Sequence, residues 1–201
     1  MKLDIKEAEE ILREAERLNP GSWIEHSKNV AIAARLIADK DPGLNSGKAY
    51  ILGLLHDIGR RKYISGMEHV LYGHAFMKEK GHEEVARICM THTFPYKDVN
   101  AIYGNWDYKR EEAEIVEKYI KDIEYDDYDL LIQLCDSFSM PDGFALIEKR
   151  FVNTALRSGI SSLIAYKWSA VMDIKKYFEG KIGCSVYKLL PNIVQNTFET
   201  F

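Results

Sequence analysis

The feature that most constrains this chain is an apolar segment that ends in two side chains able to bind a metal. Residues 51–55 are apolar throughout, and His56, Asp57 and Gly59 follow them. A segment without a polar face is predicted to be a buried helix, and burying an imidazole and a carboxylate is costly without a charged partner. A divalent cation would be such a partner. The alternative is a neutral core histidine beside a helix-capping aspartate.

Composition narrows the classes of protein to consider. The chain has 201 residues, of which 46% are hydrophobic and 29% are charged, which is typical of one soluble globular domain. The net charge of -4 argues against a nucleic-acid partner, although a local basic pocket would still take a small anion. Three scattered cysteines indicate reduced thiols. A charged N-terminus and the lack of any long apolar run predict a cytoplasmic protein without a membrane partner.

Apolar residues recur at helical spacing along most of the chain, and no segment alternates convincingly as a strand. Helices are predicted at residues 4–18, from 22 to the break at 41–43, from 46 to 57, 68–80, 82–92, from 107 onwards, 128–138, from 141–143 onwards and 161–178. Ser22 with Glu25 is predicted to form a capping box, and Ser46 and Asp107 to cap later helices. We therefore expect an all-α, single-domain helical bundle over residues 1–201, with its core at about 22–157 and a C-terminal helix and extension at 161–201.

Several residues able to bind a metal fall at core-facing positions of these helices. They are His26, His56, Asp57, His69, His92 and Asp136. Each has an ordinary explanation, as a core histidine, a helix cap or an ion-paired aspartate, but their combination indicates a common metal site. His74 lies five positions after His69, roughly 140° around a helix, and should point elsewhere. His82 is expected only to begin a helix.

Basic residues lie near these candidates. Arg60, Arg61 and Lys62 follow the His-Asp pair, either as phosphate-binding groups or as a solvated helix end. The helix expected after residue 143 carries Lys149, Arg150 and Arg157 on its outer face, and some of these would reach a phosphate. Residues 93–107 have no clear period, and we expect either a loop over the site or disorder.

The order His, His-Asp, His, His, Asp on successive helices resembles the HD superfamily of metal-dependent phosphohydrolases. The matching stretches are HSKNVA at 26–31, LLHDIG at 54–59 and LCD at 134–136, and the resemblance covers about 22–157. It implies that a first metal is bound by His26, His56, Asp57 and Asp136. It also implies that His69 and His92 bind a second ion, with Asp57 bridging the two.

Within that superfamily, the chain most resembles the bacterial symmetrical diadenosine tetraphosphate hydrolases, at HVLYGHA (69–75) and THT (91–93). The mononuclear deoxynucleotidase branch has acidic residues where this chain has Arg60, Arg61 and Lys62. The cyclic-dinucleotide phosphodiesterases with a Gly-Tyr-Pro signature have paired histidines where this chain has only His92. The resemblance thus implies hydrolysis of a phosphate ester or anhydride more firmly than any one substrate.

The resemblance implies a metal-dependent phosphohydrolase that acts on a nucleotide or another small phosphorylated metabolite. Histidine and carboxylate ligands suit one or two ions of iron, manganese, zinc or nickel, which would activate a water for attack on phosphorus. His56, Asp57, Arg60 and Arg61 are the expected catalytic residues, the arginines orienting phosphate oxygens. Two alternatives remain: a catalytically silent HD-fold domain that binds nucleotides for regulation, and a mononuclear 5'-nucleotidase.

Overall fold

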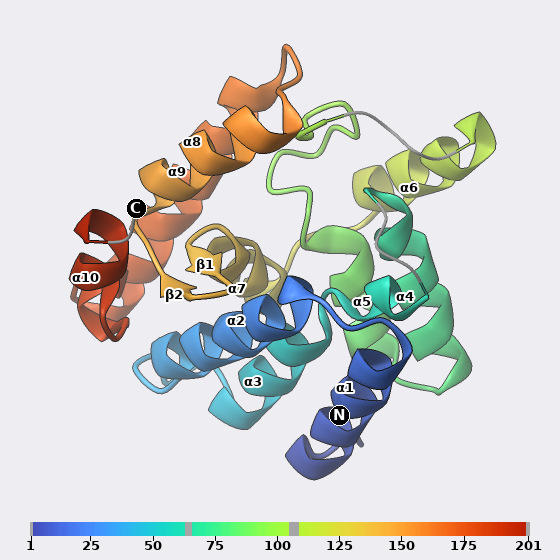
Figure 1. The fold of residues 1–201 in the computed structure, drawn as a ribbon, viewed down its shortest axis with the longest axis horizontal. Helices are drawn as coiled ribbons and strands as arrows, with labels where there is room; N and C mark the ends of the chain where they lie inside the picture. The colour runs from blue at the N-terminus through green and yellow to red at the C-terminus, as the bar shows by residue number, and fades with distance from the viewer. Residues whose placement is uncertain (1, 63–65, 105–108, 200–201) are drawn as a thin grey trace.

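The computed structural model describes residues 2–62, 66–104 and 109–199, and most of these lie in helices (Figure 1). The elements are α1 (Ile5–Leu18), α2 (Ser22–Ala38), α3 (Ser46–Leu55), the 3₁₀ helix η1 (Ile58–Arg61), α4 (Glu68–Glu79), α5 (Glu83–Thr91), α6 (Arg110–Asp122), α7 (Asp127–Asp136), β1 (Ser139–Met140), β2 (Gly143–Phe144), α8 (Ile147–Ser158), α9 (Ile164–Ile182), the 3₁₀ helix η2 (Val186–Leu189) and α10 (Ile193–Phe198). The predicted all-α class is confirmed. None of the described helices has both the length and the apolar character that crossing a membrane requires.

The centre of the fold is built on α3, the apolar segment from which the sequence argument began. Its Leu52, Leu54 and Leu55 side chains are at most 1% exposed. α2 packs along α3 through small side chains such as Ala31 and Ala34, which are fully buried and allow the two helices to approach closely. Removing this apolar surface from water is the main source of stability here. The pairing also brings the C-terminal end of α3 close to α2.

A buried carboxylate ties α5 to α7. Asp129 is fully buried, and its Oδ2 atom accepts a hydrogen bond of 2.9 Å from Arg87 Nε. Its Oδ1 atom accepts a second bond, of 2.6 Å, from the Thr91 hydroxyl. Gln133, one turn further along α7, donates to Thr91 O at 3.0 Å. These bonds fix the end of α5 against α7, and both helices end at candidate ligands.

The segment after α7 differs from the prediction. Residues expected to begin a helix at 141–143 instead form an antiparallel hairpin, in which Ser139 pairs with Phe144 and Met140 pairs with Gly143. Gly143 has a φ of 133°, a conformation that L side chains rarely adopt and that fits a turn, not a helix. The helix begins only at Ile147. The prediction that this chain has no strand is therefore wrong at this hairpin.

The C-terminal region packs on the hairpin and on the central helices, as expected for the extension after α9. Phe178 of α9 is fully buried, and α10 lies beside β2 (Figure 1). Lys149 of α8 donates to the carbonyl oxygens of Asn196 and Thr197, both at 2.8 Å. All three cysteines are free thiols, two of them buried and Cys184 half-buried, as predicted.

The helix caps were the least accurate part of the prediction. Ser22 is already the first residue of α2 and makes no capping hydrogen bond, because Gly21 holds the cap position. Asn45, not Ser46, caps α3, and its side chain accepts from Lys48 N at 2.8 Å. The predicted cap Asp107 lies outside the described residues, as do positions 105–108 of the expected loop.

Candidate metal centre

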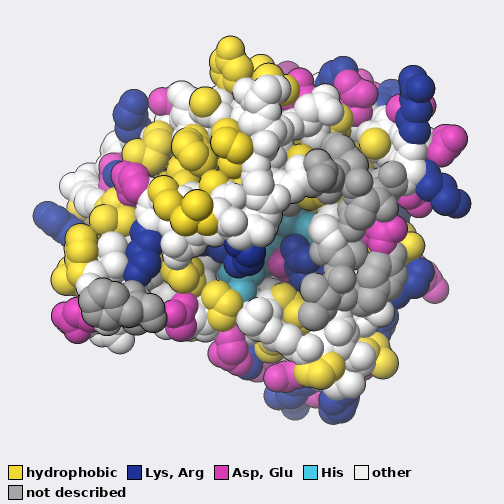
Figure 2. All heavy atoms as spheres, turned by 45° about the horizontal axis from the view of Figure 1, so that its top comes forward, with side chains coloured by type: hydrophobic (Ala, Val, Ile, Leu, Met, Phe, Trp, Pro, Cys, Tyr) yellow, Lys and Arg dark blue, Asp and Glu magenta, His cyan; other side chains and the backbone are white. Residues whose placement is uncertain are grey.

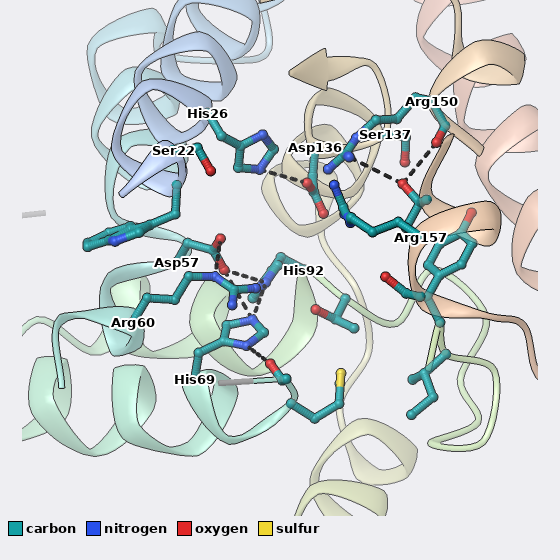
Figure 3. Close-up of a pocket in the computed structure, with 18 of the residues that line it drawn as sticks. Ser22, His26, Asp57, Arg60, His69, His92, Asp136, Ser137, Arg150 and Arg157 are labelled. Carbon is teal, nitrogen blue, oxygen red and sulfur yellow. Dashed lines mark hydrogen bonds and ion pairs between the residues drawn. The ribbon is translucent and has the colours of Figure 1, made fainter. Parts of the chain in front are cut away.

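The six predicted ligands lie together at neighbouring helix ends, and Figure 3 labels His26, Asp57, His69, His92 and Asp136 among them. Two come from first turns, His26 of α2 and His69 of α4. The others come from C-terminal ends: His56 and His92 directly follow α3 and α5, Asp57 comes next after His56, and Asp136 is the last residue of α7. Helix ends converge here from five different helices, which is how distant parts of the sequence reach one place.

Two overlapping groups of possible ligand atoms form within this cluster. One comprises His26, His56 and Asp57, and the other Asp57, His69 and His92; within each group all ligand atoms lie within 4.8 Å of one another. Asp136 extends the first group, because its Oδ1 atom is 3.0 Å from His26 Nε2. Asp57 belongs to both groups, so one carboxylate lies between two possible ion positions.

Backbone carbonyl groups orient all four imidazoles. The Nδ1 atoms bond to Ser139 O at 3.2 Å (His26), to Gly53 O at 2.7 Å (His56), to Gly66 O at 2.6 Å (His69), and to Ile88 O and Cys89 O at 3.0 and 3.1 Å (His92). A carbonyl oxygen only accepts, so each Nδ1 must carry the proton and donate it. In a neutral ring, Nε2 then presents a lone pair, and these Nε2 atoms face the cluster.

This arrangement concentrates electron pairs that need a cation. His69 Nε2 lies 3.2 Å from His92 Nε2 and 3.1 Å from Asp57 Oδ1. Within the described residues, neither Asp57 Oδ1 nor His56 Nε2 makes a hydrogen bond, although both atoms are buried. Unpaired buried polar atoms are costly. Two imidazole nitrogens and a carboxylate around one point are a good donor set for a transition metal, so the residues fit a metal centre.

The protonation states match that donor set. Burial lowers the pKa of His56 to about 4, and burial together with the Arg60 charge lowers the pKa of His69. Burial alone would raise the pKa of Asp57, but Arg60 and the neighbouring imidazoles outweigh it and hold that pKa well below its usual range. These shifts favour neutral His56 and His69 and a charged Asp57 near pH 7, which is the state that metal ligands require.

A close backbone contact sets the distance between His69 and Asp57. A Cβ atom on Gly59 would lie 1.9 Å from His69 O and 2.6 Å from Gly73 N. The first turns of α4 therefore rest directly on η1, where only a glycine fits. Gly59 and Gly73 therefore meet at this contact, which brings η1 and α4 together.

A cavity of about 680 Å³ opens onto the cluster. Figure 2 shows it as a hollow in one face, with histidine and basic side chains visible inside. Arg60 lines it, and its Nε donates to Asp57 Oδ2 at 2.7 Å. Arg150 and Arg157 of α8 also line it, so two of the three cations named on that helix reach the cavity. Lys149 does not, because it binds the α10 carbonyls.

Arg61, predicted as a second catalytic arginine, does not line this cavity. Its Nη2 lies 3.0 Å from Glu14 Oε1, and its guanidinium stacks over the Phe76 ring at 4.0 Å. The reason is the 3₁₀ geometry of η1, which turns successive side chains by about 120° and sends Arg60 and Arg61 to different sides. Lys62 likewise lies over the Tyr72 ring, at 4.0 Å.

Two histidines outside the cluster lie where the sequence predicted, and two cavity residues were not predicted. His74 lies away from the cluster, as predicted, with Nδ1 donating to Ala86 O at 3.0 Å, and His82 holds the N-cap position of α5. Lys167 and Tyr103 line the cavity but were not predicted. Lys167 comes from a segment far from the motifs, and no local pattern marks it, whereas Tyr103 belongs to the segment at 93–107 for which a loop over the site was one expectation.

Comparison with known proteins gives one family. A family model described as "HD domain" matches residues 23–140, more than half of the chain. No curated protein matches the sequence significantly. Among solved structures, the HD domain of the phosphodiesterase PgpH from L. monocytogenes is similar, with 19% sequence identity and a TM-score of 0.41. That match covers 89% of this chain and 92% of the other.

Proposed function

The chain belongs to the HD-domain family, and from that premise we propose that it is a metal-dependent phosphohydrolase with a two-ion centre. His26, His56, Asp57 and Asp136 bind the first ion. His69, His92 and the shared Asp57 bind the second. Iron, manganese, zinc and nickel suit this mixture of imidazole and carboxylate ligands.

One observation carries the proposal: three electron-rich atoms meet without a proton between them. His69 Nε2 lies 3.2 Å from His92 Nε2 and 3.1 Å from Asp57 Oδ1, and each of these nitrogens presents a lone pair because its ring donates through Nδ1. A structural histidine cluster would place a donor against an acceptor. The same arrangement favours two ions over one. His69 and His92 belong to one group of possible ligand atoms and His26 and His56 to the other, and Asp57 is common to both groups.

The reaction is hydrolysis of a phosphate ester or anhydride. A water adds to phosphorus, the bond from phosphorus to the leaving oxygen breaks, and that oxygen takes up a proton. Bound divalent ions would lower the pKa of a water and offset the charge on the phosphate oxygens. Arg60 keeps Asp57 in place through its Nε donation and holds its positive charge at the cavity wall. The buried imidazoles exclude bulk water from the base of the cavity.

We further propose that the substrate is a nucleotide or a phosphorylated metabolite of similar size. A cavity of about 680 Å³ lies within the range that encloses such a molecule. Its wall includes the aromatic side chains of Trp23, Tyr103 and Phe151, which offer flat surfaces for a base. Trp168 Nε1 donates to the Tyr103 hydroxyl at 2.7 Å and fixes that ring in position.

Metal analysis of two histidine variants tests the proposal. His69→Ala should lose about half of the bound metal, because only the second ion depends on His69. The same variant should lose most of its activity on nucleotides and other phosphate esters, measured in the presence of manganese. His74→Ala is the matched control on the same helix, and it should keep both, since His74 bonds to Ala86 O instead.

The result that would refute the two-ion centre is full metal content and full rate in His69→Ala and in His92→Ala. Those variants would then indicate a mononuclear enzyme. Wild-type protein that takes up no transition metal would remove the whole proposal. Metal uptake and tight nucleotide binding without any turnover would instead favour a regulatory domain.

A further inference from the structure

The cavity carries more positive charge than the metal centre needs. Among the described residues, Arg60, Arg150, Arg157 and Lys167 line it together with two carboxylates, Asp57 and Asp136. Within the described residues, Arg60 is paired with Asp57, but none of the other three cations has a carboxylate within ion-pair distance. These three come from α8 and α9, outside residues 23–140 that match the family.

The three unpaired cations are close enough to affect one another. Burial and the Arg150 charge together lower the pKa of Lys167 to about 8, against the opposing charge of Asp136. Burial, Arg150 and Arg60 lower the pKa of Arg157 in the same way. Like charges gathered at one wall destabilise the protein unless an anion offsets them. Figure 3 shows Arg150 and Arg157 reaching from α8 towards Asp136.

A single phosphate does not offset this charge. The lining side chains of the described residues sum to two positive charges before any metal binds, and each divalent ion adds two more. A phosphomonoester dianion, bound at the metals, therefore leaves the cavity with at least two positive charges. A second phosphate group is the smallest common addition that would reduce this excess positive charge.

We propose that Arg150, Arg157 and Lys167 form a subsite for a second phosphate group, so that the substrates are small organic compounds with at least two phosphates. This inference rests on the proposed phosphohydrolase function and adds the class of its substrate. Two of the cations are already held in place. Arg150 Nη1 donates to Thr154 Oγ1 at 3.2 Å, and Lys167 Nζ donates to Thr93 O at 2.8 Å. Arg157 makes no hydrogen bond or ion pair within the described residues and has its donors available.

Binding of phosphonates tests the subsite without requiring turnover. Calorimetry on manganese-loaded protein would compare methylphosphonate with alkylene bisphosphonates of one to four methylene groups, which span a range of distances between the two phosphorus atoms. The best bisphosphonate should bind wild type at least about tenfold more tightly than methylphosphonate, as expected for new charge-assisted contacts. Arg157→Met and Lys167→Met should each reduce that advantage severalfold.

Lys176→Met is the matched control. Lys176 also lies on α9 and has the same charge, but its side chain is 76% exposed and pairs with Asp173, so this variant should keep the full bisphosphonate advantage. Melting curves would verify that each variant is folded. The subsite is refuted if no bisphosphonate outcompetes methylphosphonate. It is also refuted if Arg157→Met and Lys167→Met weaken both ligands equally, because the cations would then bind the first phosphate.

Kinetics separate this inference from the proposed function. If the enzyme is active, Arg157→Met should lower kcat/KM for a substrate with two phosphates about tenfold more than for its monophosphate counterpart. Equal losses on both substrates would overturn the subsite while leaving the hydrolase intact. If no ester is hydrolysed but the bisphosphonate advantage persists and depends on Arg157, the proposed function fails and the subsite stands.

Discussion

Replacing Gly59 with alanine is the sharpest test of how the fold positions the metal centre. The added Cβ would lie 1.9 Å from His69 O, whereas side-chain carbons are essentially never found closer than 3.0 Å to such an atom. Both neighbours, His69 O and Gly73 N, belong to the backbone, so no side chain can move aside to relieve the contact. The first turn of α4 must therefore move away from η1 by at least about 1.1 Å.

The size of the effect follows from that displacement. Overpacking of this kind costs about 1–3 kcal/mol, which corresponds to a fall in Tm of roughly 2–12 °C for a chain of this length. His69 moves with the helix, so its Nε2 atom leaves its position 3.1 Å from Asp57 Oδ1. A misplacement of about 1 Å near reacting groups reduces rates by about 100-fold. The second ion should be weakened much more than the first, which does not depend on α4.

Scanning calorimetry and metal analysis of Gly59→Ala would measure both effects. Gly180→Ala is the matched control, because Gly180 lies in α9 and a Cβ there would meet nothing within 4 Å. That control should stabilise the protein by about 0.5–1 kcal/mol through helix propensity. A Gly59→Ala protein with unchanged Tm and full metal content would refute the reasoning that η1 and α4 are held at backbone contact.

Three other predictions concern stability. Arg87→Met should destabilise the protein by about 3 kcal/mol in denaturant titrations, because it leaves the buried Asp129 carboxylate without its cation; Arg110→Met, which removes an exposed pair, should change it by less than about 0.5 kcal/mol. Burial raises the pKa of Asp127, but the Lys181 ammonium more than offsets this and holds that pKa below its usual value. Asp127 therefore stabilises the fold above its unfolded pKa of about 3.9, so Asp127→Asn should lower Tm at pH 6 and cease to do so as the pH falls through the lowered folded-state pKa of Asp127. Manganese added to chelator-treated protein at 100 times its Kd should stabilise the fold by about 2.7 kcal/mol in thermal melts, and an unchanged Tm would argue against a metal centre in the folded state.

Helices were predictable where the apolar period is long and uninterrupted. α1, α4 and α5 begin and end within about two residues of the sequence expectation. Their apolar residues recur clearly at helical spacing, and a glycine or a proline follows each helix closely. Caps were less predictable because several polar residues compete for one position, as with Asn45 and Ser46. The hairpin at 139–144 was missed because a two-residue strand has no period to detect.

The site was predictable for a different reason. His26, His56, His69 and His92 each fall at a helix end on the core-facing side, and that placement is readable from local spacing. The direction of a side chain within a short turn is not readable in this way, so Arg61 was grouped with Arg60 although the two point to different sides. Lys167 reaches the cavity through the packing of α9, a relation between distant segments that no local pattern encodes.

The main-chain anchoring of the four imidazoles bears on how the centre tolerates mutation. In many metal sites a carboxylate side chain orients the ligand histidine, and its loss weakens the metal. Here the partners are carbonyl oxygens, such as Gly53 O and Gly66 O, which no point substitution deletes. Substitutions of neighbouring side chains should therefore leave the imidazoles oriented, as long as the helix ends keep their positions. Redesign of metal preference on the imidazole side would correspondingly have to exchange a histidine itself, because the carbonyl groups that orient the four rings belong to the backbone.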